Sequence, residues 1–115
     1  MKRSLAELYS IIRQAGLPEP GGLPIPAIMA AIAYEESRGD PSAWVAHDPP
    51  TNPNAPPSSG LYQVPKGAWP EIYEITEKVR LHPTLSDEEK ILAMTELARP
   101  ILEDALSTAS TATRR

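Results

Sequence analysis

A first helix is predicted near the start of the chain from the spacing of its apolar residues. Ser4 followed by Glu7 has the spacing of a capping box, in which each side chain bonds the backbone of the other residue. Apolar residues then recur at helical intervals until Gly16, a residue type that commonly ends helices. We therefore expect a helix over residues 5–15 whose apolar face carries Leu5, Leu8, Ile11 and Ile12.

A second helix is predicted after the Pro- and Gly-rich segment 17–24. Pro26 stands where a first-turn proline is favoured, and the pattern continues to about Ser37. Gly39 can adopt the left-handed conformation that ends a helix. Alanines fill much of the remaining helix surface, so we expect close packing and a central position in the fold. The apolar stripe consists of Ile25, Ile28, Met29 and Ile32.

Two more helices are predicted in the second half of the chain. Pro70 favours a short helix within residues 67–79, and Ser86 with Glu89 repeats the capping-box spacing at the start of the next helix. Pro100 should bend or break that last helix, because proline lacks an amide hydrogen and crowds the preceding turn. The apolar face of this helix carries Ile91, Leu92, Leu97, Ala98, Ile101, Leu102 and Leu106.

The segment from Asp40 to Ser59 has no period and contains DPPTNPNAPPSS, which is too rich in proline for a helix or an interior strand. A segment of this length in a small domain is usually functional or mobile. No alternating pattern is long enough to predict a strand. We expect a mainly α fold of four or five helices, forming a single domain over residues 1–107 with the proline-rich loop over one face and a flexible tail over residues 108–115.

The composition narrows the classes of function. With 41% hydrophobic and 23% charged residues, the chain is ordinary for a globular domain. A net charge of -4 without a basic run argues against nucleic-acid binding, which needs clustered Lys and Arg. The absence of cysteine excludes disulfides and thiolate metal sites, and His47 and His82 lack the spacing of metal ligands. No window approaches the ~20 apolar residues of a membrane span.

Two adjacent glutamates stand at the end of the second predicted helix. At 100° per residue, Glu36 falls about 30° from the centre of the apolar stripe and Glu35 about 70° from it. Burial beside the core and the negative end of the helix dipole both raise the pKa of a carboxyl at this place. Glu36 is therefore our candidate for a general acid, which must be protonated before it acts. The alternative is that Glu36 turns outward and pairs with a Lys or Arg, as most glutamates do.

Residues 36–44, ESRGDPSAW, and residues 59–64, SGLYQV, resemble two signature blocks of the lysozyme-like lytic transglycosylases, the SLT-type peptidoglycan-cleaving domains. In that family the first block ends an apolar helix in Glu-Ser and continues through a turn to Asp or Asn and then Pro. The second block is Gly-Leu, a bulky residue, Gln and an aliphatic residue. The resemblance implies a small lysozyme-like helical domain whose long proline-rich loop covers the active-site face.

By this resemblance Glu36 is the single catalytic acid and base. It would protonate the oxygen between N-acetylmuramic acid and N-acetylglucosamine, and then take a proton as the muramoyl 6-hydroxyl closes a 1,6-anhydro ring. Ser37 would orient the carboxyl or an acetamido group, while Tyr62 and Gln63 would line the sugar groove that begins at Gly60. The implied partner is the peptidoglycan glycan strand, and no metal or cofactor is implied.

Three alternatives stand beside the lyase. Asp48 is a possible second carboxylate, which a hydrolytic lysozyme would need opposite its acid. No tyrosine follows Tyr73, where the family usually carries a Tyr-Asn-Gly motif, and this favours a non-catalytic glycan-binding or structural virion module. The third alternative is a plain helical interaction module. Trp44 and Trp69 would either stack on a sugar face or anchor the core.

The predicted place of action is the bacterial cell wall. The first residues, MKRSLAELYSIIRQAG, contain Glu7 and Arg13 where a signal peptide has an apolar region, and no small-residue cleavage site follows. We therefore expect delivery in a phage particle or by a phage-encoded lysis system, or excision from a longer chain.

Overall fold

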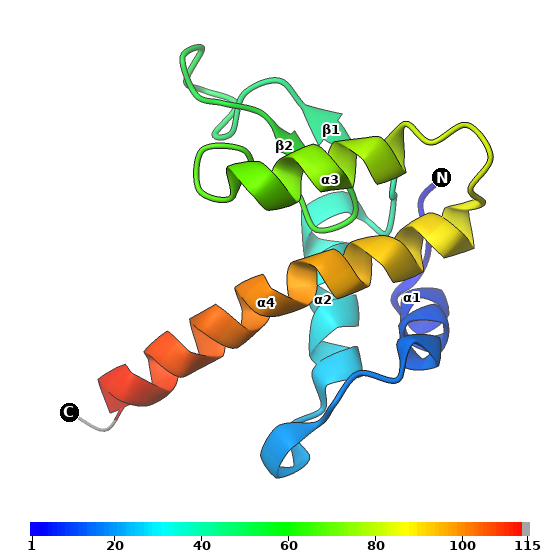
Figure 1. Ribbon diagram of the computed structural model, residues 1–115, viewed down its shortest axis with the longest axis vertical. Coiled ribbons are helices and arrows are strands. Elements are labelled where there is room, and N and C mark those ends of the chain that lie inside the picture. The colour runs from blue at the N-terminus through cyan, green and yellow to red at the C-terminus, as the bar shows by residue number, and fades with distance from the viewer. Residues whose placement is uncertain (114–115) are drawn as a thin grey trace.

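The computed structural model describes the backbone of residues 1–113 and the side chains of residues 1–108, and within them the fold is mainly α. Figure 1 shows α4 crossing α2, with α1 beside α2 and with α3 between α4 and the strands. The α-helices are α1 (Leu5–Ile12), α2 (Ile25–Ser37), α3 (Pro70–Arg80) and α4 (Asp87–Thr113). Two short 3-10 helices are η1 (Arg13–Ala15) and η2 (Pro20–Gly22).

The predicted capping boxes are confirmed at both helices. Ser4 Oγ accepts from the Glu7 amide at 3.1 Å, and the Ser4 amide donates to the Glu7 carboxylate at 3.2 Å. The same pair of bonds joins Ser86 and Glu89 at 3.1 and 3.0 Å. Gly16, at φ 62°, ends the first helical segment in the left-handed conformation, as its sequence position predicted.

Helix α2 has the predicted extent, but its buried face is different from the predicted stripe. Ile28 and Ile32 are only partly buried, whereas Ala30 and Ala33 are fully buried. The centre of the buried face is therefore rotated by about 80° toward the alanines. The physical reason is that alanine lets neighbouring backbones approach closely, so the small residues face the core. The buried residues of α2 are Ile25, Pro26, Met29, Ala30 and Ala33.

The end of α2 also differs from the prediction. Arg38, rather than Gly39 alone, takes the left-handed conformation, with φ 55°, and its amide donates to the carbonyls of Ala33 and Tyr34. Gly39 follows at φ 75°, and a Cβ there would lie 2.9 Å from the carbonyl oxygen of Arg3. Two consecutive left-handed residues turn the chain sharply away from the helix.

Three strands of two residues each were not predicted: β1 (Trp44–Val45), β2 (Ser58–Ser59) and β3 (Val64–Pro65). They form an antiparallel sheet in the order β1-β2-β3, with Trp44 opposite Ser59 and Ser59 opposite Val64. A two-residue strand is too short to show an alternating pattern, which explains why these strands were not predicted from the sequence. The proline-rich segment between β1 and β2 closes on itself, because the Asp48 amide donates to the carbonyl of Pro56 at 3.0 Å.

Helix α4 runs through Pro100 to Thr113, so of the two expected effects, a bend or a break, the break does not occur. Pro100 is exposed, and the carbonyl of Glu96 that loses its amide partner belongs to an exposed residue, so water can replace the lost bond. Residues 108–113, predicted as part of a flexible tail, continue the helix, and residues 114–115 lie outside the described part of the chain.

The core forms where α1, α2, α4 and the turn after β2 meet. Its most deeply buried large side chains are Leu8, Ile12, Met29, Leu61, Ile91 and Met94. No helix among the described residues combines the length and the apolar character needed to cross a bilayer.

Candidate functional site

Ser37 joins the end of α2 to the turn that follows β2. Its hydroxyl lies 2.7 Å from the carbonyl oxygen of the fully buried Leu61 and 3.0 Å from that of Ala33, and it accepts from the Asp40 amide at 3.2 Å. A hydroxyl has one hydrogen to donate, and the shorter contact is the one to Leu61. The two sequence blocks are therefore in direct contact. Ser37 was expected to orient either the Glu36 carboxyl or an acetamido group of the substrate. Its hydrogen bonds go to backbone groups and not to the carboxyl, because its side chain points at the turn, and the contact with substrate stays a prediction.

The side chain of Gln63 stabilises the turn that follows β2 by hydrogen bonds to backbone carbonyls. Its side-chain nitrogen donates to the carbonyls of Gly60 at 2.9 Å and Ala43 at 3.2 Å, and the Gly60 amide donates to the same Ala43 carbonyl at 2.7 Å. Gln63 has a positive φ of 49°, which a non-glycine residue adopts only where its surroundings hold it. Both amide hydrogens of Gln63 are thus used within the protein, and its role in lining a sugar groove stays a prediction.

Gly60 begins this turn at φ 80°, and it is tightly packed. A Cβ at this position would lie 2.8 Å from Thr76 Cγ2 on α3 and 3.0 Å from Met94 Sδ on α4. Because Gly60 has no side chain, the turn can pack directly against α3 and α4. Gly60 is a packing contact in the structure, and its part in a sugar groove stays a prediction.

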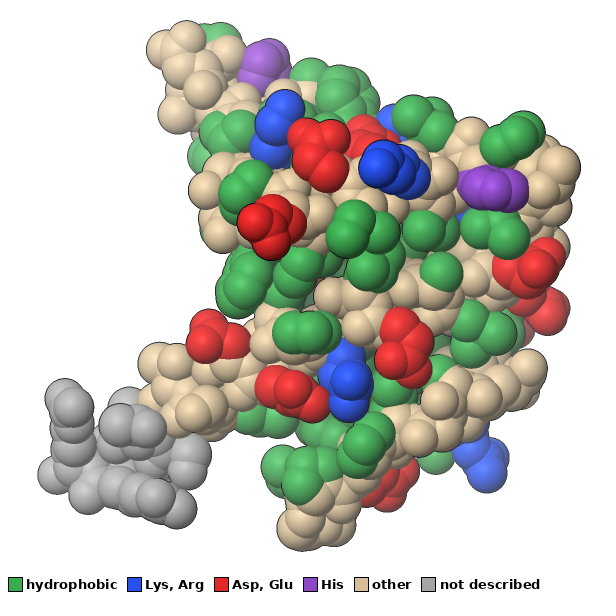
Figure 2. Space-filling model, viewed as in Figure 1, with side chains coloured by type: hydrophobic (Ala, Val, Ile, Leu, Met, Phe, Trp, Pro, Cys, Tyr) green, Lys and Arg blue, Asp and Glu red, His purple; other side chains and the backbone are tan. Residues whose placement is uncertain are grey.

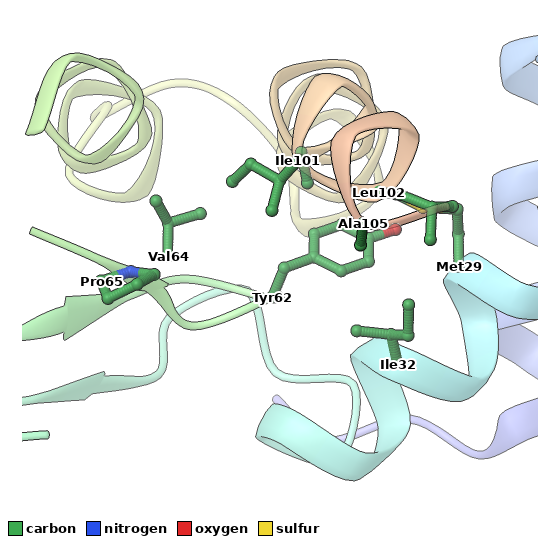
Figure 3. Close-up of a pocket in the computed structure, with 9 residues that line it drawn as sticks. Met29, Ile32, Tyr62, Val64, Pro65, Ile101, Leu102 and Ala105 are labelled. Atoms are coloured by element: carbon green, nitrogen blue, oxygen red, sulfur yellow. The ribbon is translucent and has the colours of Figure 1, made fainter. Parts of the chain in front are cut away.

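Tyr62 is buried, and its ring points between α2 and α4 (Figure 3). The Thr95 hydroxyl donates to the carbonyl of Ile91, so the Tyr62 hydroxyl donates to Thr95 across 2.7 Å. Burial raises the pKa of the Tyr62 phenol, with the Thr95 bond opposing it. Tyr62 therefore stays neutral and contributes its ring to the wall of a pocket.

This pocket has a volume of about 160 Å³ and is almost wholly apolar. On the face shown in Figure 2 the molecule is hollowed beside the C-terminal half of α4, and apolar side chains gather there. Ile32 of α2 lines the pocket one helical turn before Glu36, so the pocket and the carboxyl lie on the same side of α2. The lining residues are Met29, Ile32, Tyr62, Val64, Pro65, Ala98, Ile101, Leu102 and Ala105.

Glu36 is exposed, not turned into the core as its helical phase predicted. The rotation of the buried face of α2 places Glu36 at the margin of that face, about 50° from its centre. Partial burial of the carboxyl is the largest cause that raises the pKa of Glu36, and the charges of Asp48 and Glu35 raise it further. Among the described residues no ion pair involves Glu36, so the expected alternative of a Lys or Arg partner is not observed either.

Asp48 lies near enough to Glu36 to raise its pKa, although the two residues are separated by the turn after α2 and by β1. The carboxylate of Asp48 is fixed, because the hydroxyl of the fully buried Ser58 donates to Oδ2 at 2.7 Å. The proline-rich segment thus supplies a second, oriented carboxylate near Glu36.

The two tryptophans have different surroundings. Trp44 is 44% exposed, and its indole nitrogen donates to the hydroxyl of Tyr73 at 3.0 Å. Trp69 is partly buried at the start of α3, where it precedes Pro70. Trp44 is therefore the more exposed of the two tryptophans.

Three parts of the site were missed by the sequence reasoning. The part of α4 after Pro100 lines the pocket, and Ser58 holds Asp48, but no local pattern signals either contact. Tyr73, Glu77 and Arg80 form a hydrogen-bonded set beside Trp44. Their spacing of four and three residues places them on one face of α3, a signal that could have been recognised.

Comparison of the chain with protein-family models, with curated proteins and with solved structures found no match in any of the three. The resemblance of the two sequence blocks to lytic transglycosylases therefore stays a prediction.

Proposed function

We propose that this chain is a lysozyme-like lytic transglycosylase that cleaves the β-1,4 bond between N-acetylmuramic acid and N-acetylglucosamine in peptidoglycan. The observation that carries the proposal is Glu36. It is an accessible carboxyl at the end of α2, and its pKa is raised by loss of water and by neighbouring negative charge. A raised pKa keeps part of the Glu36 population protonated at pH values where an ordinary glutamate is ionised.

One carboxyl is enough for this reaction. Protonated Glu36 gives its proton to the glycosidic oxygen, and the bond from that oxygen to C1 of the muramoyl residue breaks. The 6-hydroxyl oxygen of the same residue then bonds to C1, and its proton goes to the Glu36 carboxylate. Glu36 returns to its protonated state, no water is consumed, and the product ends in a 1,6-anhydro ring.

The hydrogen bonds around Glu36 support the proposal, because they form a rigid frame for the end of α2. Ser37 bonds the turn at Leu61, and Gln63 ties the same turn to Ala43, so the two sequence blocks keep a fixed relation. A general acid must stay within hydrogen-bond reach of the oxygen that it protonates, and such a frame limits its movement. In this proposal the apolar pocket beside Ile32 keeps water from one side of the carboxyl.

Hydrolysis is the second candidate, and the position of Asp48 favours it. An inverting hydrolase pairs its acid with a second carboxylate that activates water on the opposite face of the sugar. Asp48 acts electrostatically on Glu36 and is held in one orientation by Ser58, as a base of this kind would be. The lyase remains the leading proposal because both sequence blocks resemble that family.

Digestion of purified sacculi tests the catalytic role of Glu36. Removal of a general acid lowers rates by about 10²- to 10⁴-fold, so Glu36→Gln should release muropeptides at least about 100-fold more slowly than the wild type. Glu35→Gln is the matched control, because it removes the same charge from the adjacent residue and should keep its rate within about twofold. Equal release by wild type and Glu36→Gln, or no release by either, would overturn the proposal.

A further inference from the structure

A second cluster of aromatic and charged side chains lies where the sheet meets α3. We name it the Trp44 cluster, and it consists of Trp44, Tyr73, Glu77 and Arg80. Trp44 stands on β1, which is an edge strand, and 44% of its surface is exposed. The exposed part of the Trp44 ring is apolar surface in contact with water, so a ligand that covers it would gain free energy.

The Trp44 ring is held in one orientation by a chain of hydrogen bonds. Its nitrogen donates to the Tyr73 hydroxyl at 3.0 Å, and Tyr73 donates to Glu77 Oε1 at 3.1 Å. Arg80 donates to both carboxylate oxygens of Glu77, and its guanidinium carbon lies 5.9 Å from the centre of the Trp44 ring. Burial raises the pKa of Glu77, but the bonds from Arg80 and Tyr73 outweigh it, so Glu77 stays ionised. The ring is therefore preorganised.

The Trp44 cluster lies on the face of the sheet opposite to Asp48, the carboxylate whose charge raises the pKa of Glu36. Trp44 and Ser59 are paired residues, so their side chains share a face, and Trp44 contacts α3 from that face. Ser58 is the next residue along β2 and points to the other face, where it bonds Asp48. The negative charge of Asp48 raises the pKa of Glu36, so the two carboxyls lie near each other. A ligand on Trp44 would thus not occupy the catalytic position.

The charges of this region are paired within it. Arg80 is bonded to Glu77, and Lys66, which lies 5.6 Å from the centre of the Tyr73 ring, is 3.6 Å from Glu74. Because the two cations that lie against the Trp44 and Tyr73 rings are each matched by a carboxylate, the aromatic face itself carries no unpaired charge that would select an anion or a cation. The region offers an aromatic face together with hydrogen-bond groups, since Nη1 of Arg80 has no partner among the described residues. These features suit a neutral ligand that has an apolar face and hydroxyl groups at its edge, which describes a pyranose ring.

We propose that the Trp44 cluster is a second glycan-binding site, on which one sugar ring of a glycan strand stacks against Trp44 while its hydroxyls bond Arg80 and Glu77. The choice of peptidoglycan as the source of that glycan rests on the proposed function. The site holds the protein on the insoluble wall while Glu36, which lies near Asp48, acts on a different part of the strand.

Co-sedimentation with sacculi tests the site in a Glu36→Gln background, in which digestion does not remove the bound protein. Loss of one aromatic stacking contact costs about 0.5–1.5 kcal/mol, so adding Trp44→Ala should weaken binding by about two- to tenfold. Trp44→Phe keeps a ring and should restore part of that loss. The matched control is Tyr9→Ala on α1, because Tyr9 is 40% exposed and also has an arginine, Arg13, 5.5 Å from its ring centre.

Circular dichroism and thermal unfolding of each variant show whether it is folded, and Trp44→Phe serves as the test variant if Trp44→Ala is not. The same experiment with glycan strands stripped of their stem peptides identifies the ligand. A Trp44-dependent loss on both substrates supports the site, even if the wild type releases no muropeptides and the proposed function falls. Binding that is equal in the Trp44 and Tyr9 variants overturns the site even if the enzyme is active. Binding that requires the stem peptides, or no binding at all, also overturns it.

Discussion

Replacement of Gly60 by alanine tests whether the turn after β2 is set against α3 and α4. Two costs add at this position. The φ of 80° is left-handed, which costs a residue with a Cβ roughly 1–2 kcal/mol. The new Cβ would also lie 2.8 Å from Thr76 Cγ2 and 3.0 Å from Met94 Sδ, and overpacking of this kind costs about 1–3 kcal/mol. Gly60→Ala should therefore lower the free energy of unfolding by about 2–5 kcal/mol.

Gly21→Ala separates the two costs. Gly21 also has a left-handed φ, 62°, but a Cβ there would meet no atom within 4 Å. This variant should lose only the conformational part, roughly 1–2 kcal/mol. Urea unfolding followed by circular dichroism measures both free energies, and in thermal unfolding the difference should appear as a further fall in Tm of about 4–12 °C. Equal losses in the two variants would refute the close packing at Gly60, and with it the rigid relation between the turn and helices α3 and α4.

Three further variants probe the site. Ser37→Ala should lower the free energy of unfolding by about 1–3 kcal/mol in urea, because it leaves the buried Leu61 carbonyl unbonded; a loss of activity without a loss of stability would contradict this. The pKa of Glu36 is raised on folding, so its contribution to stability is complete below the ordinary value of 4.5 and is lost as the pH rises through the raised value. Glu36→Gln should accordingly be more stable than the wild type at pH 7, by less than about 1 kcal/mol for an exposed group, and equal to it at pH 4; the reverse order would contradict the direction of the shift. Asp48→Asn should lower the pKa of Glu36 and move the alkaline limb of the pH–rate profile for sacculus digestion to lower pH, with the maximal rate kept within about tenfold; a loss of 100-fold or more would indicate hydrolysis with Asp48 as base.

The helices could be predicted from the sequence because the signals that define them are local. Both capping boxes and Gly16 lie within a few residues of the helix ends that they fix. The buried face of α2 could not be predicted in the same way. Alanine is compatible with both core and surface, and only the approach of the neighbouring elements decides that Ala30 and Ala33 are the buried residues.

The candidate site could be predicted only as far as Glu36 and the two sequence blocks. Besides their local partners, Ser37 and Gln63 bond backbone carbonyls of residues 24 and 20 positions away, and backbone groups carry no sequence signal. The bond between Ser58 and Asp48 depends on how the proline-rich segment closes. These contacts arise from the path of the chain in space, which residue types along the sequence do not define.

The end groups of the released muropeptides test the central claim, that Glu36 serves as acid and base without a water molecule. Mass spectrometry of wild-type digests of sacculi should find 1,6-anhydro-muramoyl ends. Asp48→Asn digests should contain the same ends, and Glu36→Gln digests should contain at most about one hundredth of the wild-type amount. Reducing muramoyl ends in the wild-type digest, or the absence of soluble muropeptides from it, would contradict the claim.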